Sequence, residues 1–150
     1  MLKNPKTYNP LSDYNKAINK LVKNGIRPTK QRRIIAKLLF DKGKRHVSAE
    51  DLYDEIKEDK RKISLATVYN TLKYFTKLKL IKEIVVDQNK SLYCTNNESH
   101  YHLYIENEGK VVDIPTNNIN LNIPTIPACL NLHNIDVIVR VRTLKEKLKN

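Results

Sequence analysis

Four short segments with helical spacing of apolar residues, each bounded by residues that start or stop helices, fill most of residues 14–77. Residues 14–22 place apolar side chains three and four positions apart and precede Gly25, a common helix stop. Residues that favour helix starts stand before the other three segments: Pro28 with Thr29, Ser48, and Ser64. The pattern predicts a small helical bundle.

Two extended segments follow the fourth helix. Residues 81–86 and 91–94 are short runs suited to strands, and the four residues between them, Asp-Gln-Asn-Lys, favour a turn. A helical bundle that ends in such a hairpin is typical of a winged helix-turn-helix, in which the hairpin is the wing.

The fourth helix is predicted to have a polar face without carboxylates. At about 100° per residue, its inward stripe comprises Leu65, Val68, Leu72, Phe75 and Thr76. Its outward face comprises Thr67, Asn70, Tyr74 and Lys77, and its flanks Ala66, Tyr69, Thr71 and Lys73. No acidic residue occurs from Ser64 to Lys82. Because an amide can pair with adenine, Thr can contact a thymine methyl and Lys can reach phosphates, this surface suits a DNA major groove. An ordinary solvent-facing helix is the alternative.

Positive charge is concentrated in the same part of the chain. Residues 1–90 hold 22 Lys and Arg against 10 Asp and Glu, whereas residues 91–150 hold six of each, so the formal net charge of +12 belongs to the first part. A polyanion-binding module joined to a neutral module would have this distribution. A basic surface that binds no specific partner would have the same charge distribution.

Three more extended segments are predicted in the last third of the chain, at residues 101–105, 110–114 and 135–141. Residues 115–127 hold three Pro and four Asn and cannot form a long helix. We expect the three segments to form one sheet, whose apolar edge strand can pair with its two-fold copy. The sequence therefore predicts an α+β fold, with an N-terminal winged helix-turn-helix followed by a small α/β dimerisation domain.

Four motifs resemble those of one family and follow its order. Residues 25–32 (GIRPTKQR) resemble G-L-R-x-T-x-Q-R, and residues 46–53 (HVSAEDLY) resemble H-x-S-A-E-D-L-Y. Residues 64–72 (SLATVYNTL) resemble S-x-A-T-V-Y-R-T-L, and residues 100–103 (HYHL) resemble H-x-H-L. These are motifs of the ferric uptake regulators. Residues 109–115 and 135–142 are similar to the iron response regulator branch of that family.

The resemblance implies a sequence-specific DNA-binding transcriptional regulator, usually a repressor, of iron, haem or oxidative-stress genes. It implies a cytoplasmic homodimer on an AT-rich inverted repeat near promoters. The expected domains are a DNA-binding domain over residues 1–91, a hinge over 92–98 and a dimerisation and ligand-sensing domain over 99–150. The expected DNA contacts are Lys23, Arg27, Gln31, Arg32, Ser64, Thr67, Tyr69, Asn70 and Lys73. Helical periodicity puts Tyr69 on a flank, so its base contact rests mainly on the resemblance.

The resemblance also implies a site for a divalent metal such as Fe, Mn or Zn. His46, His100 and His102 match the family's ligand histidines, and Asp113 matches an acidic ligand of its sensing site. Cys94 stands where the family has a carboxylate. A thiolate there could bind zinc or ferrous iron, and the alternative is a buried strand thiol. Side-chain directions alternate along a strand, so the two histidines of H-x-H point to one side and suit a metal or haem iron.

Part of the family's metal pattern is missing. The first C-x-x-C pair of its structural zinc site falls on Ile105 and Glu108, so we expect that closed thiolate site to be absent. A further sensing histidine falls on Ile135, with His133 two positions away. The loss of this sensing histidine agrees with the iron response branch, whose members are associated with haem. We therefore predict a divalent metal, haem or both as ligand of the H-x-H pair.

Other classes of protein fit the sequence less well. It contains no Gly-rich phosphate loop, nucleophile elbow or H-E-x-x-H motif, so we predict no enzymatic activity. No apolar run approaches the roughly 20 residues that cross a bilayer, and no signal peptide is recognisable, so we expect a cytoplasmic protein without membrane association. The alternative function is a DNA-binding regulator whose C-terminal module is purely structural and binds no ligand. An RNA-binding winged helix is a second alternative.

Overall fold

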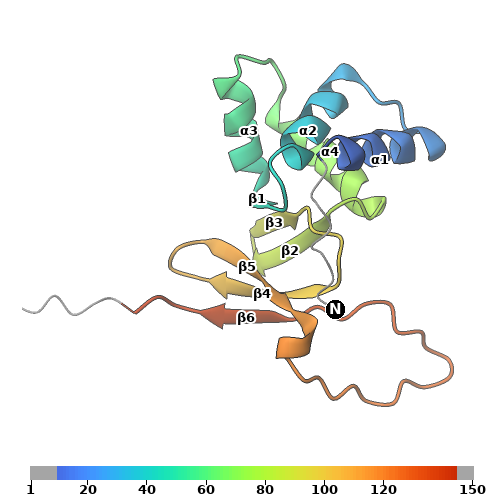
Figure 1. Cartoon of the computed structure of the whole chain (residues 1–150), viewed down its shortest axis with the longest axis vertical. Coiled ribbons are helices and arrows are strands. Elements are labelled where there is room, and N and C mark those ends of the chain that lie inside the picture. The colour runs from blue at the N-terminus through green and yellow to red at the C-terminus, as the bar shows by residue number, and fades with distance from the viewer. Residues whose placement is uncertain (1–9, 145–150) are drawn as a thin grey trace, which may run out of the picture. The chain divides into compact units, whose positions relative to one another are not determined.

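The computed structural model describes residues 10–144, which fall into two compact units divided between Asn97 and Glu98 (Figure 1). The first unit contains four α-helices and a three-stranded sheet, and the second contains another three-stranded sheet. No helix among residues 10–144 is long and apolar enough to span a membrane.

The helices of the first unit are α1 (Pro10–Lys23), α2 (Lys30–Phe40), α3 (Ala49–Glu58) and α4 (Leu65–Lys77). The predicted starts of the last three are confirmed. Thr29, Ser48 and Ser64 each accept a backbone N–H through the side-chain oxygen and so cap α2, α3 and α4. Ser48 and Asp51 form a reciprocal capping box, which satisfies two of the free N–H groups at the start of α3.

The four helices pack around one hydrophobic core. Its fully buried side chains include Leu21, Ile35, Leu39, Leu52, Ile56, Val68, Leu72 and Phe75. The predicted inward stripe of α4 is confirmed at its three central positions, and Thr71, which was expected on a flank, is buried as well. Burial of this side of α4 turns its polar side outward.

The hairpin predicted as the wing is formed by β2 (Lys82–Asp87) and β3 (Lys90–Cys94), which pair antiparallel. A further strand, β1 (His46–Val47), pairs with the other edge of β3 and was not predicted, because two residues carry no periodicity. Arg45 N–H donates to Thr95 Oγ1 at 2.9 Å, and Thr95 N–H donates to the Arg45 carbonyl at 3.1 Å. These bonds extend the β1–β3 ladder and fix the position of β1.

The second unit is built on β4 (His100–Ile105), β5 (Lys110–Pro115) and β6 (Ile138–Val141). The order is β5-β4-β6, with β4 antiparallel to β5 and parallel to β6, so the predicted sheet is confirmed. Residues 116–137, all described, contain one short 3-10 helix (η1, Thr116–Asn118) and no α-helix, as the prolines predicted. The part of the expected hinge over residues 92–94 belongs to β3.

Gly25 ends α1 with a φ of +71°, and the next N–H, of Ile26, donates to the Leu21 carbonyl at 2.9 Å. A Cβ at Gly25 would have no atom within 4 Å, so Gly25→Ala changes only the backbone preference. We expect this substitution to lower the free energy of unfolding by about 1–2 kcal/mol. Lys60 has a φ of 55° just after α3, so Lys60→Gly should raise the free energy by up to about 1 kcal/mol. Urea denaturation measures the free energy of unfolding of the two variants and of the wild type. Equal values for all three proteins would contradict the expectation.

Candidate functional site

The outward side of α4 is polar, aromatic and basic. Its exposed polar and aromatic side chains are those of Tyr69, Asn70, Lys73, Tyr74 and Lys77. Tyr69, which periodicity placed on a flank, keeps 42% of its surface exposed. Ser64 Oγ accepts the Thr67 N–H at 3.1 Å and lies 2.9 Å from Thr67 Oγ1, so these two hydroxyls are engaged in capping the helix. The groups of α4 that are open to a partner are therefore the two phenol rings, one amide and two ammonium groups.

The predicted phosphate contacts lie at the surface near the start of α2. Lys23, Arg27 and Gln31 are exposed, and Arg32 is half-buried. Arg32 Nη1 donates to the Arg27 carbonyl at 2.6 Å, and its guanidinium lies 5.0 Å from the centroid of the Tyr74 ring. A cation over an aromatic face is attracted by the ring. Arg32 is therefore held between the start of α2 and the outward side of α4.

One carboxylate contacts this surface. The Tyr69 hydroxyl donates a short hydrogen bond to Glu50 Oε1, in the first turn of α3. This hydrogen bond raises the pKa of Tyr69, and burial and the charge of Glu50 raise it further. Sequence reasoning missed Glu50 because it lies 19 residues before Tyr69, and only tertiary packing brings the two together.

Tyr69 and Glu50 belong to a hollow of about 550 Å³ on the first unit. It is lined by Ser48, Glu50, Tyr69, Glu83, Asn89, Lys90, Ser91 and Tyr93. Burial, followed by the charge of Glu83, raises the pKa of Tyr93 to about 12. The hollow therefore combines two protonated phenols with two carboxylates, next to the outward side of α4.

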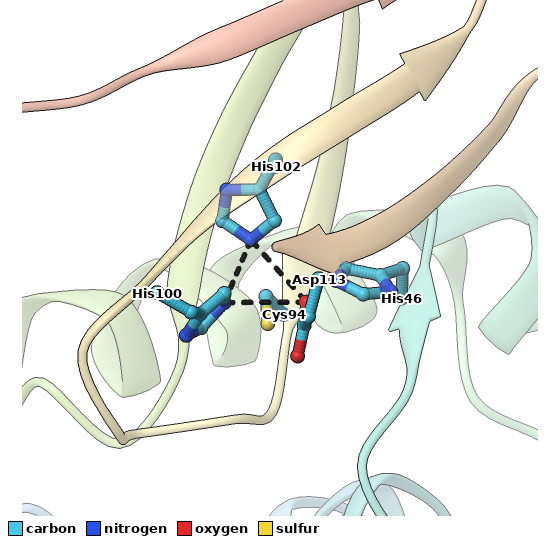
Figure 2. Close-up of side chains that lie close together, drawn as sticks. All are labelled: His46, Cys94, His100, His102 and Asp113. Atoms are coloured by element: carbon cyan, nitrogen blue, oxygen red, sulfur yellow. Dashed lines mark hydrogen bonds and ion pairs between the residues drawn. The ribbon is translucent and has the colours of Figure 1, made fainter. Parts of the chain in front are cut away.

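Three potential metal ligands meet in the second unit (Figure 2). His102 on β4 lies opposite Asp113 on β5, and His100 lies two residues earlier on β4. His100 Nε2 lies 2.8 Å from His102 Nε2 and 3.3 Å from Asp113 Oδ1, and His102 Nε2 lies 3.7 Å from the same oxygen. Ligand atoms about 2.0–2.1 Å from a tetrahedral zinc ion lie about 3.3 Å apart. These three residues, the triad, therefore have donors and spacing that fit one divalent ion.

The triad is oriented and partly shielded from water. His100 Nδ1 lies 2.6 Å from the Glu98 carbonyl, which can only accept, so Nδ1 donates, and in the neutral imidazole Nε2 carries the lone pair that faces the triad. The side chains of His100 and His102 are 4% and 10% exposed, and that of Asp113 is 28% exposed. A second hydrogen bond of this kind is common for metal-binding imidazoles, because it fixes the ring and its tautomer.

The other two predicted ligands, His46 and Cys94, belong to the first unit (both are labelled in Figure 2). They are opposite each other in the antiparallel β1–β3 pair, so their side chains leave the sheet on the same face. Cys94 is buried, and its Sγ lies 3.9 Å from the Asn96 carbonyl. An imidazole beside a thiol is a ligand pair suited to zinc or ferrous iron. Each unit thus brings together the predicted ligands that it carries.

Known proteins are similar to this chain in sequence and in fold. The profile of the Ferric uptake regulator family matches residues 23–141. The peroxide-responsive repressor PerR of Staphylococcus saprophyticus is 35% identical over 97 residues, which are 65% of this chain and 65% of that protein, just under two thirds of its length. The ferric uptake regulator (Fur) of Vibrio cholerae aligns with a TM-score of 0.65 and 21% identity over 84% of this chain and 98% of its own, a likeness of fold alone. A zinc-bound manganese uptake regulator aligns with a TM-score of 0.58 and 28% identity over 85% of this chain and 98% of its own. The chain therefore belongs to the ferric uptake regulator family.

Proposed function

We propose that this chain is a metal-responsive, sequence-specific DNA-binding transcriptional repressor. The observation that carries the proposal is the outward side of α4, which exposes Tyr69, Asn70 and Lys73 in the basic part of the chain. Asn70 and Tyr69 read base edges in the major groove, and the cations contact phosphates. The residues proposed to support these contacts are Lys23, Arg27, Gln31, Arg32, Ser64 and Thr67.

The proposed effector is a divalent metal bound by the triad. His100, His102 and Asp113 would hold the ion, which would supply positive charge beside the Asp113 carboxylate. The two histidines project from one face of β4 and therefore place the proposed site on that face. The zinc-bound relative supports zinc or manganese, and the family resemblance supports iron. The resemblance implies His46 and Cys94 as further ligands, and metal titration of Cys94→Ser and His46→Ala tests this.

The target genes are proposed to be those of peroxide stress or iron supply. The name of the staphylococcal relative supports peroxide stress.

The likeness of residues 109–115 and 135–142 to the iron response branch supports haem as a second effector, and the His100 and His102 rings, 4.5 Å apart, are the proposed haem contacts. A haem titration tests whether haem is an effector. A Soret shift that is lost when both histidines are replaced supports haem, and the absence of a shift leaves the divalent metal as the proposed effector.

The second unit is proposed to form a homodimer. Residues 114–135 contain no Lys, Arg, Asp or Glu, in a chain of which 29% of residues are charged. They expose the apolar side chains of Leu121, Ile123, Ile126, Leu130 and Leu132. Two copies of a chain with a net charge of +12 meet with least repulsion through an uncharged surface. Sedimentation equilibrium tests the dimer, which should have twice the chain mass of 17.5 kDa.

The repressor proposal is tested by fluorescence anisotropy with an AT-rich inverted-repeat duplex, with Mn²⁺, Fe²⁺ or Zn²⁺ added in turn. Binding should weaken steeply as salt rises from about 50 to 200 mM. Arg32→Ala should weaken binding to all duplexes and reduce the salt slope by about 1 for each copy of the chain, because one phosphate contact is lost. Arg61→Ala, which replaces another surface arginine of the first unit, is the control and should keep the slope.

Two results would count against these assignments. An unchanged slope for Arg32→Ala would remove Arg32 from the phosphate contacts. If the wild-type chain bound no duplex at low salt with any of the three metals, or preferred hairpin RNA, the repressor proposal would be wrong.

A further inference from the structure

We infer that Glu50 determines sequence specificity by positioning the Tyr69 ring for base reading. The inference rests on the proposed DNA-binding function and adds to it a carboxylate that lies outside the recognition helix. Glu50 belongs to α3, and its Oε1 accepts the hydrogen bond of the Tyr69 hydroxyl across the space between α3 and α4.

The geometry gives this contact a consequence for recognition. The Tyr69 ring is 42% exposed, so it can meet a base edge while its hydroxyl is bound to Glu50. A free tyrosine side chain on a helix surface samples several rotamers, and DNA binding would have to fix one of them at a cost in conformational entropy. The hydrogen bond fixes the ring beforehand. Its orientation is therefore set by the protein and not by the DNA.

The charge of Glu50 acts on the affinity for DNA of any sequence and not on base preference. Phosphate contacts supply most of the affinity for DNA of any sequence. A carboxylate at the edge of the basic surface repels the phosphates of every duplex equally, so it lowers the affinity for operator and scrambled DNA by the same factor and does not change the ratio of the two affinities. Glu83 lines the same hollow and adds a second carboxylate, but the hydrogen bond to Tyr69 belongs to Glu50.

A purely structural role for Glu50 leads to a different result. Glu50 lies in the first turn of α3, where a carboxylate also stabilises the helix dipole. Loss of that effect would lower stability and weaken binding to all DNA alike. A positioning role changes base preference at the positions that Tyr69 reads and leaves the other positions of the operator unchanged.

The experiment uses the full chain to select an operator from a randomised duplex library, with Mn²⁺ present. Affinities for that operator and for a scrambled duplex are then measured for Tyr69→Phe, Glu50→Ala, Glu50→Gln and the double variant Tyr69→Phe/Glu50→Ala. Tyr69→Phe and Glu50→Ala should each reduce the ratio of the two affinities about tenfold, through the loss of one charge-assisted hydrogen bond per copy. The double variant should lose no more than either single variant, because both remove the same bond.

Glu50→Gln and Glu83→Gln separate the hydrogen bond from the charge. Glu50→Gln keeps an acceptor for the Tyr69 hydroxyl and removes the charge, so it should retain the base preference while binding both duplexes more tightly. Glu83→Gln, the matched control in the same hollow, should also keep the base preference. Thermal midpoints of all variants, measured in parallel, report any loss of stability.

Three outcomes would overturn the inference. Equal losses on both duplexes with a lower thermal midpoint for Glu50→Ala would assign Glu50 to the stability of α3. A higher ratio of operator affinity to scrambled-duplex affinity for Glu50→Ala would make the contact inhibitory. Additive losses in the double variant would uncouple the two residues. If the wild-type chain selected no sequence at all, the proposed function would fail together with the inference, and that result is distinct from the other three.

Discussion

Replacing His100 and His102 together with alanine should weaken the binding of Zn²⁺ or Mn²⁺ at least about 10³-fold. Loss of a single outer partner of a metal ligand already costs about 10–100-fold in affinity, and this variant removes two of the three donors of the triad. Of the triad, only Asp113, whose side chain is 28% exposed, is then left to bind the ion in place of water. Titration against a chromophoric chelator measures the affinity, and the metal should then cease to change DNA binding.

The control for this prediction is His133→Ala, which removes an exposed histidine of the same unit and should leave the affinity unchanged. The backbone ladders of β4 with β5 and β6 do not depend on the imidazoles, so circular dichroism of the double variant should keep its strand signal. Should the double variant unfold, His100→Ala by itself provides the same test with less loss of buried surface. Wild-type affinity in a folded variant would contradict a metal site at the triad.

The same titration can assign the two candidate ligands of the first unit. If Cys94→Ser or His46→Ala also weakens the affinity for the ion, the part that the family resemblance gives to these two residues as ligands is supported. If the affinity is unchanged, ligation is restricted to the triad, and Cys94 is the buried strand thiol that the sequence left as the alternative. Each variant changes one side chain of the β1–β3 pair and leaves its backbone bonds in place.

The helices could be predicted from sequence because their signals are local. A cap such as Ser48, with Asp51 three residues later, specifies a helix start by bonds between near neighbours, and the structure contains those bonds. Strand β1 gave no such signal, since two residues cannot show a period and their position depends on pairing with β3, more than 40 residues later in the chain. Thr71 shows the same limit on α4, where its burial depends on how much of the helix its neighbours cover.

The candidate sites also contain features with a local sequence signal and features that depend on pairing between distant parts of the chain. Alternation along a strand was enough to predict that His100 and His102 share a face. The register that puts Asp113 opposite His102 is a property of the β4–β5 pair, and in the sequence only the family resemblance indicated it. No signal in the sequence indicated the contact between Glu50 and Tyr69. The absence of acidic residues from 64 to 82 describes one helix and not the surface that surrounds it.

Asn70→Ala should reduce affinity for the selected operator about 30-fold or more, and leave affinity for scrambled DNA unchanged. An asparagine amide can form two hydrogen bonds with adenine, a pairing worth about 1–3 kcal/mol of discrimination. In the proposed homodimer two copies act on one operator, so the expected loss is about 2–6 kcal/mol, which is about 30- to 10⁴-fold. Asn15→Ala, which replaces an exposed asparagine of α1, is the matched control and should change neither affinity.

A second substitution at this position tests the chemistry of reading more sharply. The motif that residues 64–72 resemble has arginine where this chain has Asn70. Arginine pairs with the O6 and N7 atoms of guanine, whereas asparagine pairs with the N6 and N7 atoms of adenine. Asn70→Arg should therefore move the preference at one base pair of each half-site from adenine to guanine, as library selection with the variant would reveal. An unchanged operator, or an equal loss of affinity on every duplex, would mean that Asn70 does not contact a base, and base reading by α4 would then have to be assigned to Tyr69.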